Sequence, residues 1–299
     1  MTNPKLPSTK QLRYFVALAE IGHFGRAAEA SFVSQSAFSN AIREFETLLD
    51  AQLVDRTNRN VTITALGQQI AVQARLCLQD IQALVEMAGG QQQPLTGELR
   101  MGVIPTIAPF VLPKALPRLR KTYPDLKLFL IEDQTQRIVE RMMDGELDVL
   151  LLALPWSMRS VDELPLFKDR FCLAYREGTD HVDPDNYRYS RLDADSVMLL
   201  EDGHCLRDHA LAACRIRNSE KIRSFGASSL LTLVEMIDAD LGVSFLPEMA
   251  TGSALLKNTR VKLRRLEASS YRTIGLAWRK GSRRVEEFEL LGKFLTRNR

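Results

Sequence analysis

The sequence has no long run of apolar residues, and only four cysteines in 299 residues. The best candidate for a membrane span, Val149–Trp156, is far shorter than the roughly 18–20 apolar residues that a spanning helix needs. The N-terminus lacks the apolar core of a secretory signal, and four cysteines are too few for the disulfide framework of a secreted protein. These absences predict a cytoplasmic protein with no membrane partner, whose thiols stay reduced until a chemical event oxidises them.

The overall charge is nearly balanced, at +3, and does not identify a partner. Residues 1–64 hold seven basic and six acidic side chains. From Lys257 onward basic residues outnumber acidic ones by 13 to 4, but they alternate with Leu, Val and Phe as on the solvated face of an amphipathic element. The length is sufficient for two or three domains.

Three helices are predicted in the first fifty residues. Apolar residues at helical spacing begin at Leu12, and Gly22 is suited to end that helix. A second helix is predicted over 24–30, and Ser34 is placed to cap a third. The third helix is expected to bury Phe38, Ala41, Ile42, Phe45 and Leu49.

The other face of the third helix is polar. It carries donors and acceptors suited to base edges and phosphates, namely Gln35, Ser36, Ser39, Asn40 and Arg43, with Ser34 at the cap. Two helices joined by a tight turn, the second polar outside, are typical of a helix-turn-helix. A small helical subdomain without a ligand would show the same three helices, so the pattern alone leaves both interpretations open.

A two-stranded wing is predicted after the third helix. Leu53–Val54 and Val61–Thr62 flank a polar stretch that carries Arg56 and Arg59. Two arginines at the tip of a wing are suited to phosphate contacts.

These residues resemble the DNA-binding domain of LysR-type regulators. The resemblance is carried by residues 12–20, His23-Phe24, Ala27-Ala28, Val33–Gln35 and Leu53–Arg56. Most members have Pro at the position of Ser36 and Leu at that of Phe38, and Ser36-Ala37-Phe38 departs from this pattern, so the resemblance implies the fold rather than the target preference. The resemblance implies a transcription regulator rather than an enzyme, with double-stranded promoter DNA and RNA polymerase as partners.

A long helix is predicted from Thr64 to about Ala88. Its apolar residues are spaced close to a coiled-coil seam: Leu66, Ile70, Ala74, Cys77, Ile81, Leu84 and Ala88. We expect a second copy to cover this stripe, which predicts a dimer suited to paired half-sites. Cys77 is interpreted as a packing residue, and the Gly- and Gln-rich residues 89–94 as a linker.

Strand and helix patterns alternate from Glu98 to the end, which predicts α/β layers. Strands are predicted over 99–104, 126–132, 147–154, 171–176, 197–200, 243–246 and 273–278, and helices over 110–122, 136–144, 230–240 and 284–296. The LysR-type resemblance implies a two-lobed effector domain like periplasmic binding proteins, with 97–166 and 270–299 in one lobe. The predicted fold is therefore α+β multidomain: a winged helix-turn-helix (1–64), linker helix and hinge (65–96), and effector domain (97–299).

Cys205 and Cys214 form the sharpest chemical signal. Cys205 is flanked by His204, Arg207 and Asp208, and a nearby positive charge lowers a thiol pKa. Peroxide oxidises a thiolate to a sulfenic acid, which condenses with a second thiol such as Cys214. Residues 205–214 have helical composition, so the two thiols would face opposite sides about 13 Å apart. Since a disulfide needs Cα atoms within about 7 Å, closing it would unwind the helix.

Two other interpretations of this segment stay open on the residues alone. His204, Cys205, His209 and Cys214 are all possible metal ligands, but their spacing matches no common zinc pattern, so no metal and no cofactor are predicted. Both thiols could also be buried apolar residues.

The segment also resembles the peroxide-sensing members of the LysR-type family. The matching runs are Gly203–Asp208, Gly102–Thr106, Glu132–Thr135, Pro165–Phe167 and Arg272–Leu276. The resemblance implies that Cys205 is the peroxidatic thiol and Cys214 resolves it. It further implies that Thr106, Thr135 and His204 hold peroxide or its water network and that Arg272 stabilises the thiolate. Cys172, in a strand pattern, is interpreted as packing.

The predicted function is a homodimeric or homotetrameric regulator that activates antioxidant genes when Cys205 and Cys214 are bridged, and that a thiol reductant such as glutaredoxin resets. One alternative is a LysR-type regulator that responds to a small metabolite, with incidental cysteines. A thiol peroxidase-like enzyme is a further alternative, which leaves the N-terminal helices unexplained.

Overall fold

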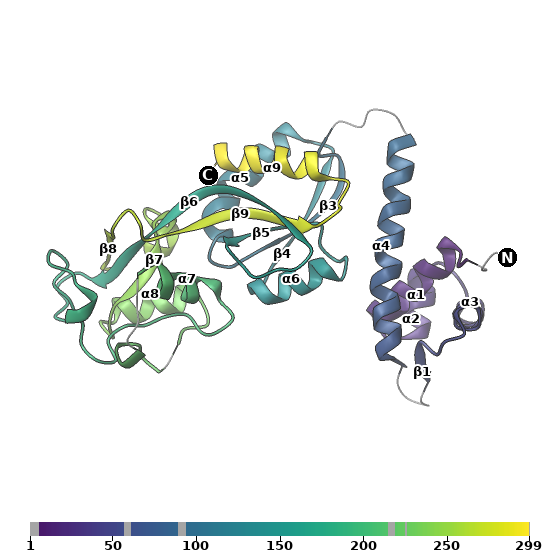
Figure 1. Ribbon diagram of the computed structural model, residues 1–299, viewed down its shortest axis with the longest axis horizontal. Helices are drawn as coiled ribbons and strands as arrows, with labels where there is room; N and C mark the ends of the chain where they lie inside the picture. The colour runs from purple at the N-terminus through teal and green to yellow at the C-terminus, as the bar shows by residue number, and fades with distance from the viewer. Residues whose placement is uncertain (1–5, 57–60, 89–93, 215–218, 225, 299) are drawn as a thin grey trace. The chain divides into compact units, whose positions relative to one another are not determined.

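The computed structural model describes residues 6–56, 61–88, 94–214, 219–224 and 226–298. Contacts divide it into two compact units, essentially residues 1–92 and 93–299 (Figure 1). Each unit has its own hydrophobic core. No described helix is both long enough and apolar enough to cross a membrane.

The first unit begins with three helices, as predicted: α1 (Thr9–Ile21), α2 (Phe24–Ala30) and α3 (Gln35–Leu49). Ser8 and Gln11 form a reciprocal capping box at the start of α1, and Gly22 ends it in the left-handed conformation with φ 65°. The Ser34 hydroxyl accepts the Ala37 N–H and caps α3. Local chemistry therefore fixes where these helices start and stop.

The core of this unit sets which face of α3 is outside. Phe38, Ile42 and Phe45 are buried, and the Phe38 ring stacks on Tyr14 with centroids 5.0 Å apart. The opposite face is polar and mostly solvent-exposed: Gln35, Ser36, Asn40 and Arg43 are exposed and Ser39 is half-buried. The predicted division of α3 into a core face and a polar face is confirmed.

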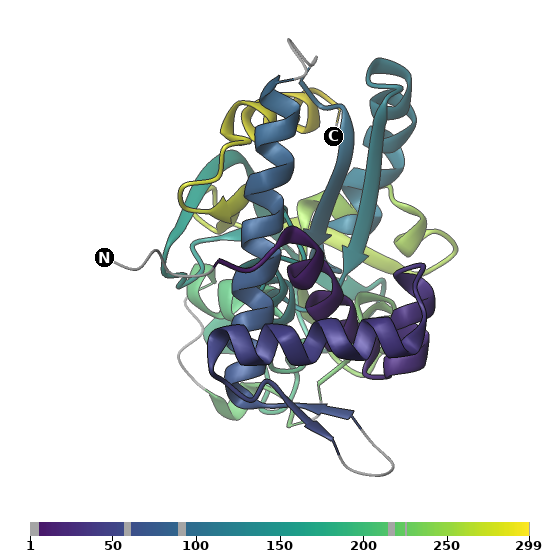
Figure 2. The same ribbon diagram turned by 90° about the vertical axis from the view of Figure 1, so that its right-hand side faces the viewer.

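A hairpin follows α3, with β1 (Val54–Arg56) antiparallel to β2 (Val61–Ile63) (Figure 2). The Glu46 carboxylate on α3 accepts the N–H groups of Leu53 and Val54, which ties the hairpin to the helix. The predicted wing is present. Its tip, including Arg59, lies outside the described residues, as does the side chain of Arg56.

The long helix α4 (Ala65–Ala88) is covered differently from the prediction. Ala74 on the predicted stripe is buried, and Ile70 and Cys77 pack against the same chain's helices, because α1 lies along the first half of α4. Ile81 and Leu84 are solvent-exposed. The expectation that a second copy covers the whole stripe is therefore wrong for Ile70, Ala74 and Cys77, whereas Leu66, Ile81 and Leu84 stay exposed.

We expect Leu84→Glu to weaken self-association, because this side chain is 62% exposed and belongs to the uncovered half of the stripe. Burying a leucine contributes about 1.5–3 kcal/mol, so the dimer dissociation constant should rise roughly 10- to 150-fold. Sedimentation velocity across a concentration series measures it. Gln82→Glu, on the same helix but outside the stripe, adds the same charge and should leave association unchanged; equal effects of the two variants would contradict the prediction.

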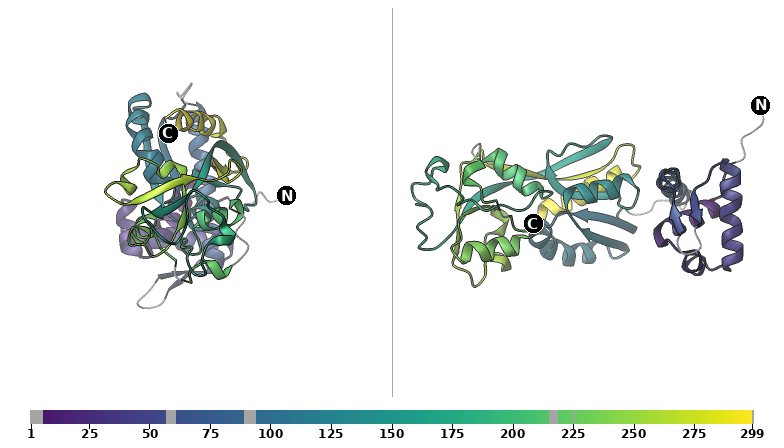
Figure 3. Two further views of the ribbon diagram at one scale, coloured as in Figure 1. Left: turned by 90° about the vertical axis from the view of Figure 1, so that its left-hand side faces the viewer. Right: turned by 90° about the horizontal axis from the view of Figure 1, so that it is seen from below.

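The second unit is built on one curled sheet with order β4-β3-β5-β9-β6-β7, and β8 pairs with β6. The strands are β3 (Gly97–Val103), β4 (Leu126–Glu132), β5 (Val149–Leu154), β6 (Val161–Arg176), β7 (Ser244–Pro247), β8 (Val261–Arg265) and β9 (Tyr271–Arg279). Parallel pairing joins β3 to β4 and β5, whereas β9 runs antiparallel to both β5 and β6. Figures 1 and 3 show the long strands β6 and β9 running through both halves of this unit.

Two hydrophobic clusters fill this unit. The first core, around Leu99, Val149 and Ile274, is covered by α5 (Ala108–Thr122), α6 (Thr135–Met143) and α9 (Val285–Arg297). The second core, around Phe171 and Phe245, includes α7 (Cys205–Ala213) and α8 (Leu230–Asp238). Single 3₁₀ turns occupy Tyr189–Arg191, Ser219–Lys221, Glu248–Ala250 and Ala254–Leu256.

Three strand predictions need correction. β6 begins at Val161 rather than at 171, because its charged first half pairs with β9 around a bulge at Pro165. β8 was not predicted, since its sequence Val-Lys-Leu-Arg-Arg is typical of a charged loop when its partner β6 is not considered. Residues 197–200 form only isolated bridges rather than a strand.

Candidate functional site

The predicted effector-site residues come from four different elements. Thr106 follows β3 and Thr135 opens α6 just after β4, so both stand beyond the carboxyl ends of parallel strands, where α/β sheets bind ligands. Arg272 lies on β9 and Cys205 is the first residue of α7. All four are buried, together with His204. The described contacts join them into two groups, one around Arg272 and one around Cys205.

Arg272 holds the first group together. Its Nε donates to Asp169 Oδ2 at 2.9 Å, its Nη1 to Thr106 Oγ1 at 2.9 Å and its Nη2 to the Thr106 carbonyl at 2.8 Å. Asp169 accepts the Met249 N–H at 3.2 Å with its other oxygen. Burial raises the pKa of Asp169, and the Arg272 charge opposes that rise. The guanidinium thus fixes the turn after β3 against β6 and β9.

Asp169 was not predicted as a site residue. It lies on β6 directly opposite Arg272 in the antiparallel register. The sequence offers only a charged triplet, Lys168-Asp169-Arg170, in which nothing marks the middle residue as buried. Only the pairing of β6 with β9 reveals its partner.

Cys205 belongs to the second group and is almost fully buried in the first core. Burial raises the pKa of its thiol, while the charge of Arg272, the Thr135 hydroxyl and the Ala153 backbone act to lower it. The expectation that neighbouring charge lowers this pKa overall is therefore wrong. Arg207 is not aimed at the thiol: it pairs with Asp202 at 3.1 Å and donates to the Leu200 carbonyl.

The Thr135 hydroxyl is buried beside the Cys205 thiol and has no oxygen or nitrogen partner among the described residues. Leaving a buried hydroxyl unpaired costs about 1–3 kcal/mol. Thr106 has its oxygen engaged by Arg272 as acceptor, so its own O–H is also available as a donor. Two hydroxyl donors are thus available at this end of the sheet to a thiolate or to the oxygen of a small ligand.

His204 precedes α7 and lies near Gln134, with 3.5 Å between the two Nε2 atoms. Because the amide nitrogen can only donate, the imidazole Nε2 must be the acceptor. The residue before His204 has to be a glycine. The φ of Gly203 is 96°, and a Cβ at this position would lie 2.8 Å from Gln134 Oε1. The structure thus joins His204 to the segment that carries Thr135.

Cys214 lies at the opposite end of α7, as its C-cap. It packs against the second core, and burial raises the pKa of its thiol to about 12. The predicted helix is present, so Cys214 lies nine residue steps, about 13 Å of rise, from Cys205. All four cysteines are free thiols.

The remaining candidates around α7 have other contacts. His209 Nε2 donates to the Pro155 carbonyl at 3.2 Å, and burial lowers the pKa of this imidazole. Cys172 is buried on β6, where burial raises the pKa of its thiol to about 11. Within the described parts of the chain, no group of three or more His, Cys, Asp or Glu residues is placed to hold a metal ion.

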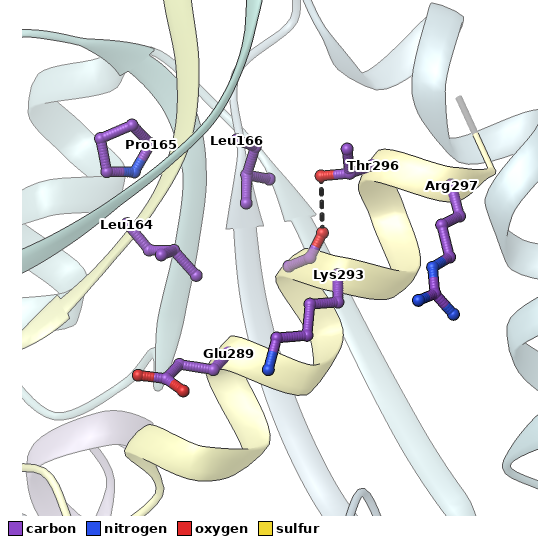
Figure 4. Close-up of a pocket in the computed structure, with 8 residues that line it drawn as sticks. Leu164, Pro165, Leu166, Glu289, Lys293, Thr296 and Arg297 are labelled. Atoms are coloured by element: carbon purple, nitrogen blue, oxygen red, sulfur yellow. Dashed lines mark hydrogen bonds between the residues drawn. The ribbon is translucent and has the colours of Figure 1, made fainter.

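Two surface grooves of the second unit lie outside this buried cluster. One, of about 440 Å³, runs between β6 and α9 (Figure 4) and is lined by Leu164, Pro165, Leu166, Glu289, Gly292, Lys293, Thr296 and Arg297. The other, of about 560 Å³, is polar and borders the start of α7 at Asp202 and Arg207. Neither is lined by any residue predicted for the peroxide pocket.

Comparison with known families defines the class of the protein. Residues 9–68 match the bacterial regulatory helix-turn-helix protein, lysR family, and residues 92–299 match the LysR substrate binding domain. The chain belongs to the LysR family of transcription regulators: a helix-turn-helix DNA-binding domain joined to a two-lobed α/β effector domain, as predicted. Its relatives are transcription regulators, not enzymes.

Individual relatives cover almost the whole chain. It is 41% identical over 293 residues to the HTH-type transcriptional regulator EstR of Acinetobacter baylyi, a match that covers 98% of this chain and 97% of that protein. It is 36% identical over 284 residues to the DNA-binding transcriptional dual regulator OxyR of Escherichia coli, covering 95% and 93%. A full-length OxyR variant from Pseudomonas aeruginosa superimposes with a TM-score of 0.79 at 31% identity, covering 97% and 95% of the two chains. The chain is therefore an OxyR-like member of the family.

We expect Asp169→Asn to destabilise the second unit by about 3–5 kcal/mol, because it leaves the Arg272 charge buried and unpaired. Both tryptophans, Trp156 and Trp278, lie in this unit, so urea unfolding followed by tryptophan fluorescence reports on it. Glu163→Gln, an exposed change on the same strand, is the control. An unfolding free energy unchanged by Asp169→Asn would show that the ion pair contributes nothing.

Proposed function

We propose that this LysR-family regulator senses hydrogen peroxide by forming a reversible disulfide between Cys205 and Cys214, and that the bridged form activates oxidative-stress defence genes. The observation that carries the proposal is the buried Cys205 thiol beside the unpartnered Thr135 hydroxyl and within the field of Arg272. Relatives such as that of Haemophilus influenzae, 37% identical over 276 residues, bear the name hydrogen peroxide-inducible genes activator.

The proposed oxidation of Cys205 by hydrogen peroxide has two steps. The Cys205 thiolate attacks one peroxide oxygen, the O–O bond breaks, and a sulfenic acid and hydroxide form. The Cys214 thiol then attacks the sulfenic sulfur, the S–S bond forms and water leaves. The hydroxyls of Thr106 and Thr135 are suited to donate to the peroxide oxygens, His204 to complete the pocket, and the positive charge of Arg272 to stabilise the thiolate.

Formation of the disulfide between Cys205 and Cys214 requires α7 to unwind. A disulfide needs Cα atoms within about 7 Å, and an intact α7 holds the two cysteines about 13 Å apart along its axis. Unwinding would pull Cys205 out of the first core and break the hydrogen bond from His209 to Pro155. Oxidation would therefore repack the region where the two cores meet, which supplies a two-state switch.

The DNA-binding surface that we propose is the polar face of α3 with its cap, and the wing. Its residues are Ser34, Gln35, Ser36, Ser39, Asn40, Arg43, Arg56 and Arg59. A homodimer or homotetramer acting in the cytoplasm, with promoter DNA, RNA polymerase and a thiol reductant such as glutaredoxin as partners, fits this function. No cofactor is required.

A second candidate function is regulation by a small-molecule inducer, with cysteines that do not react. The relative EstR supports this second candidate, because its name does not refer to peroxide. The chain is 41% identical to EstR and 36% identical to the Escherichia coli OxyR. The two functions differ in one measurable property, the fate of Cys205 and Cys214 in peroxide.

We expect a small excess of hydrogen peroxide to remove two hydrogens from the intact protein and to yield a cross-linked peptide pair containing Cys205 and Cys214. Peptide mapping by mass spectrometry without reductant measures this. Cys205→Ser should abolish the product and any peroxide effect on DNA binding, whereas Cys77→Ser should keep both. A normal response in Cys205→Ser would refute peroxide sensing by this pair and favour the second candidate.

We expect the rate of Cys205 oxidation to rise with pH between about 6 and 8.5, because burial raises the thiol pKa and only the thiolate reacts. Below the pKa the thiolate fraction grows about tenfold per pH unit. Thr135→Val should slow the reaction at every pH by roughly tenfold or more, since a lost hydrogen bond to a charged group is worth about 1.5–3 kcal/mol.

Quenched-flow alkylation of the remaining thiol measures both effects. Thr122→Val, an exposed threonine on α5, is the matched control. A rate that does not change with pH would mean that Cys205 rests as a thiolate, contrary to its burial.

A further inference from the structure

Phe32 is the most exposed large hydrophobic side chain in the described part of the chain, at 95%. It lies in the turn that joins α2 to α3. Its backbone φ is 56°, in the left-handed region that a residue with a Cβ rarely adopts. A phenylalanine is therefore held in an unfavourable backbone conformation with its ring in solvent.

Leu95 shows what normally accompanies this conformation. It is the other large apolar residue with positive φ among the described residues, and its side chain is fully buried in the first core. Packing offsets the backbone strain at Leu95, whereas Phe32 gains no such packing. The described residues therefore supply no packing that offsets the strain at Phe32.

The turn holds the ring outward. The Phe32 N–H donates to the Glu29 carbonyl at 3.0 Å, and the Val33 N–H donates to the Ala28 carbonyl at 3.1 Å. Val33 takes the inward position and packs against the core of the three helices. With its neighbours fixed in this way, Phe32 cannot turn into the core without breaking the turn.

The position of Phe32 relates it to the DNA-binding face. It is two residues before Ser34, the cap of α3, so their Cα atoms lie within about 7 Å of each other. In a helix-turn-helix the first residues of the second helix contact base edges in the major groove. The exposed Phe32 ring thus lies close in the chain to the start of α3, where such contacts are made.

We propose that Phe32 is a specificity-determining DNA contact, which packs its ring on thymine 5-methyl groups in the major groove. The thymine methyl is the apolar group that this groove presents, and phenylalanine is among the side chains that contact it. A phosphate would gain nothing from a phenyl ring. The inference rests on the DNA-binding surface proposed above: the ring adds preference for thymine next to the bases assigned there to Gln35 and Ser36, without adding charge.

The test uses the full-length protein and an operator that the wild-type protein selects from a random DNA pool. The operator is synthesised once with thymine and once with uracil, which lacks the 5-methyl group. Fluorescence anisotropy measures affinity at several salt concentrations. Phe32→Asn removes the ring and keeps a residue that tolerates left-handed backbone, Phe32→Tyr keeps the ring, and Leu6→Asn removes another exposed apolar side chain of the same unit as a control.

We expect Phe32→Asn to bind thymine DNA about tenfold more weakly than the wild type, and Phe32→Tyr and Leu6→Asn to bind as the wild type does. Uracil should weaken the wild type by a similar factor and leave Phe32→Asn unchanged. The salt dependence of both proteins should have the same slope, because an apolar contact displaces no counterions.

Three results would overturn the proposal. Phe32→Asn could bind thymine DNA as tightly as the wild type while losing self-association or capture of a protein partner, which would assign the ring to a protein surface. Phe32→Asn could bind the thymine operator and the uracil operator more weakly by the same factor, so that replacing thymine with uracil still weakens the variant as much as the wild type. The Leu6→Asn control could lose as much affinity. Thermal unfolding checks that the variant folds; should Phe32→Asn fail to fold, Phe32→Gly, which adopts this φ freely, replaces it.

Discussion

The buried ion pair between Arg272 and Asp169 is the constraint on which the effector unit depends. A guanidinium with no exposed surface is tolerated only when its charge and its donors are satisfied, and Asp169 and Thr106 do this from β6 and from the turn after β3. The same charge is the main opposition to the desolvation of Cys205. One side chain therefore fixes three segments of the fold and sets the electrostatics of the thiol.

Helix α7 places its two cysteines against different hydrophobic cores. Cys205 packs in the first core and Cys214 against the second, and burial raises the pKa of both. Burial disfavours the thiolate, so in the proposed sensor selectivity for a small oxidant would come from access to the sulfur and from the hydroxyl donors. The helix that keeps the thiols apart is short, and the hydrogen bond from His209 to Pro155 is one of the contacts that hold it. A short helix of this kind is suited to unwind when the proposed disulfide forms.

The DNA-binding unit shows a different use of burial. Aromatic packing of Phe38, Phe45 and their neighbours sets the rotation of α3, so that its polar side chains face outward. The same helices also cover Ile70, Ala74 and Cys77 of α4, whereas Ile81, Leu84 and Val85 near its end stay exposed. The unit thus buries most of its apolar residues in its own core and leaves a few exposed, among them Phe32.

The sequence by itself determined the elements with local causes: the capped helices around Ser34 and Gly22, the buried strand β5, the helical stretch between the two cysteines, and the family to which they belong. It did not determine the pairing of Asp169 with Arg272, the charged strands β8 and early β6, or the raised pKa of Cys205. Capping and apolar periodicity act over a few residues, so they can be recognised along the chain. Register, burial and the desolvation of a thiol arise from segments far apart in the sequence, and only the tertiary structure brings those segments together.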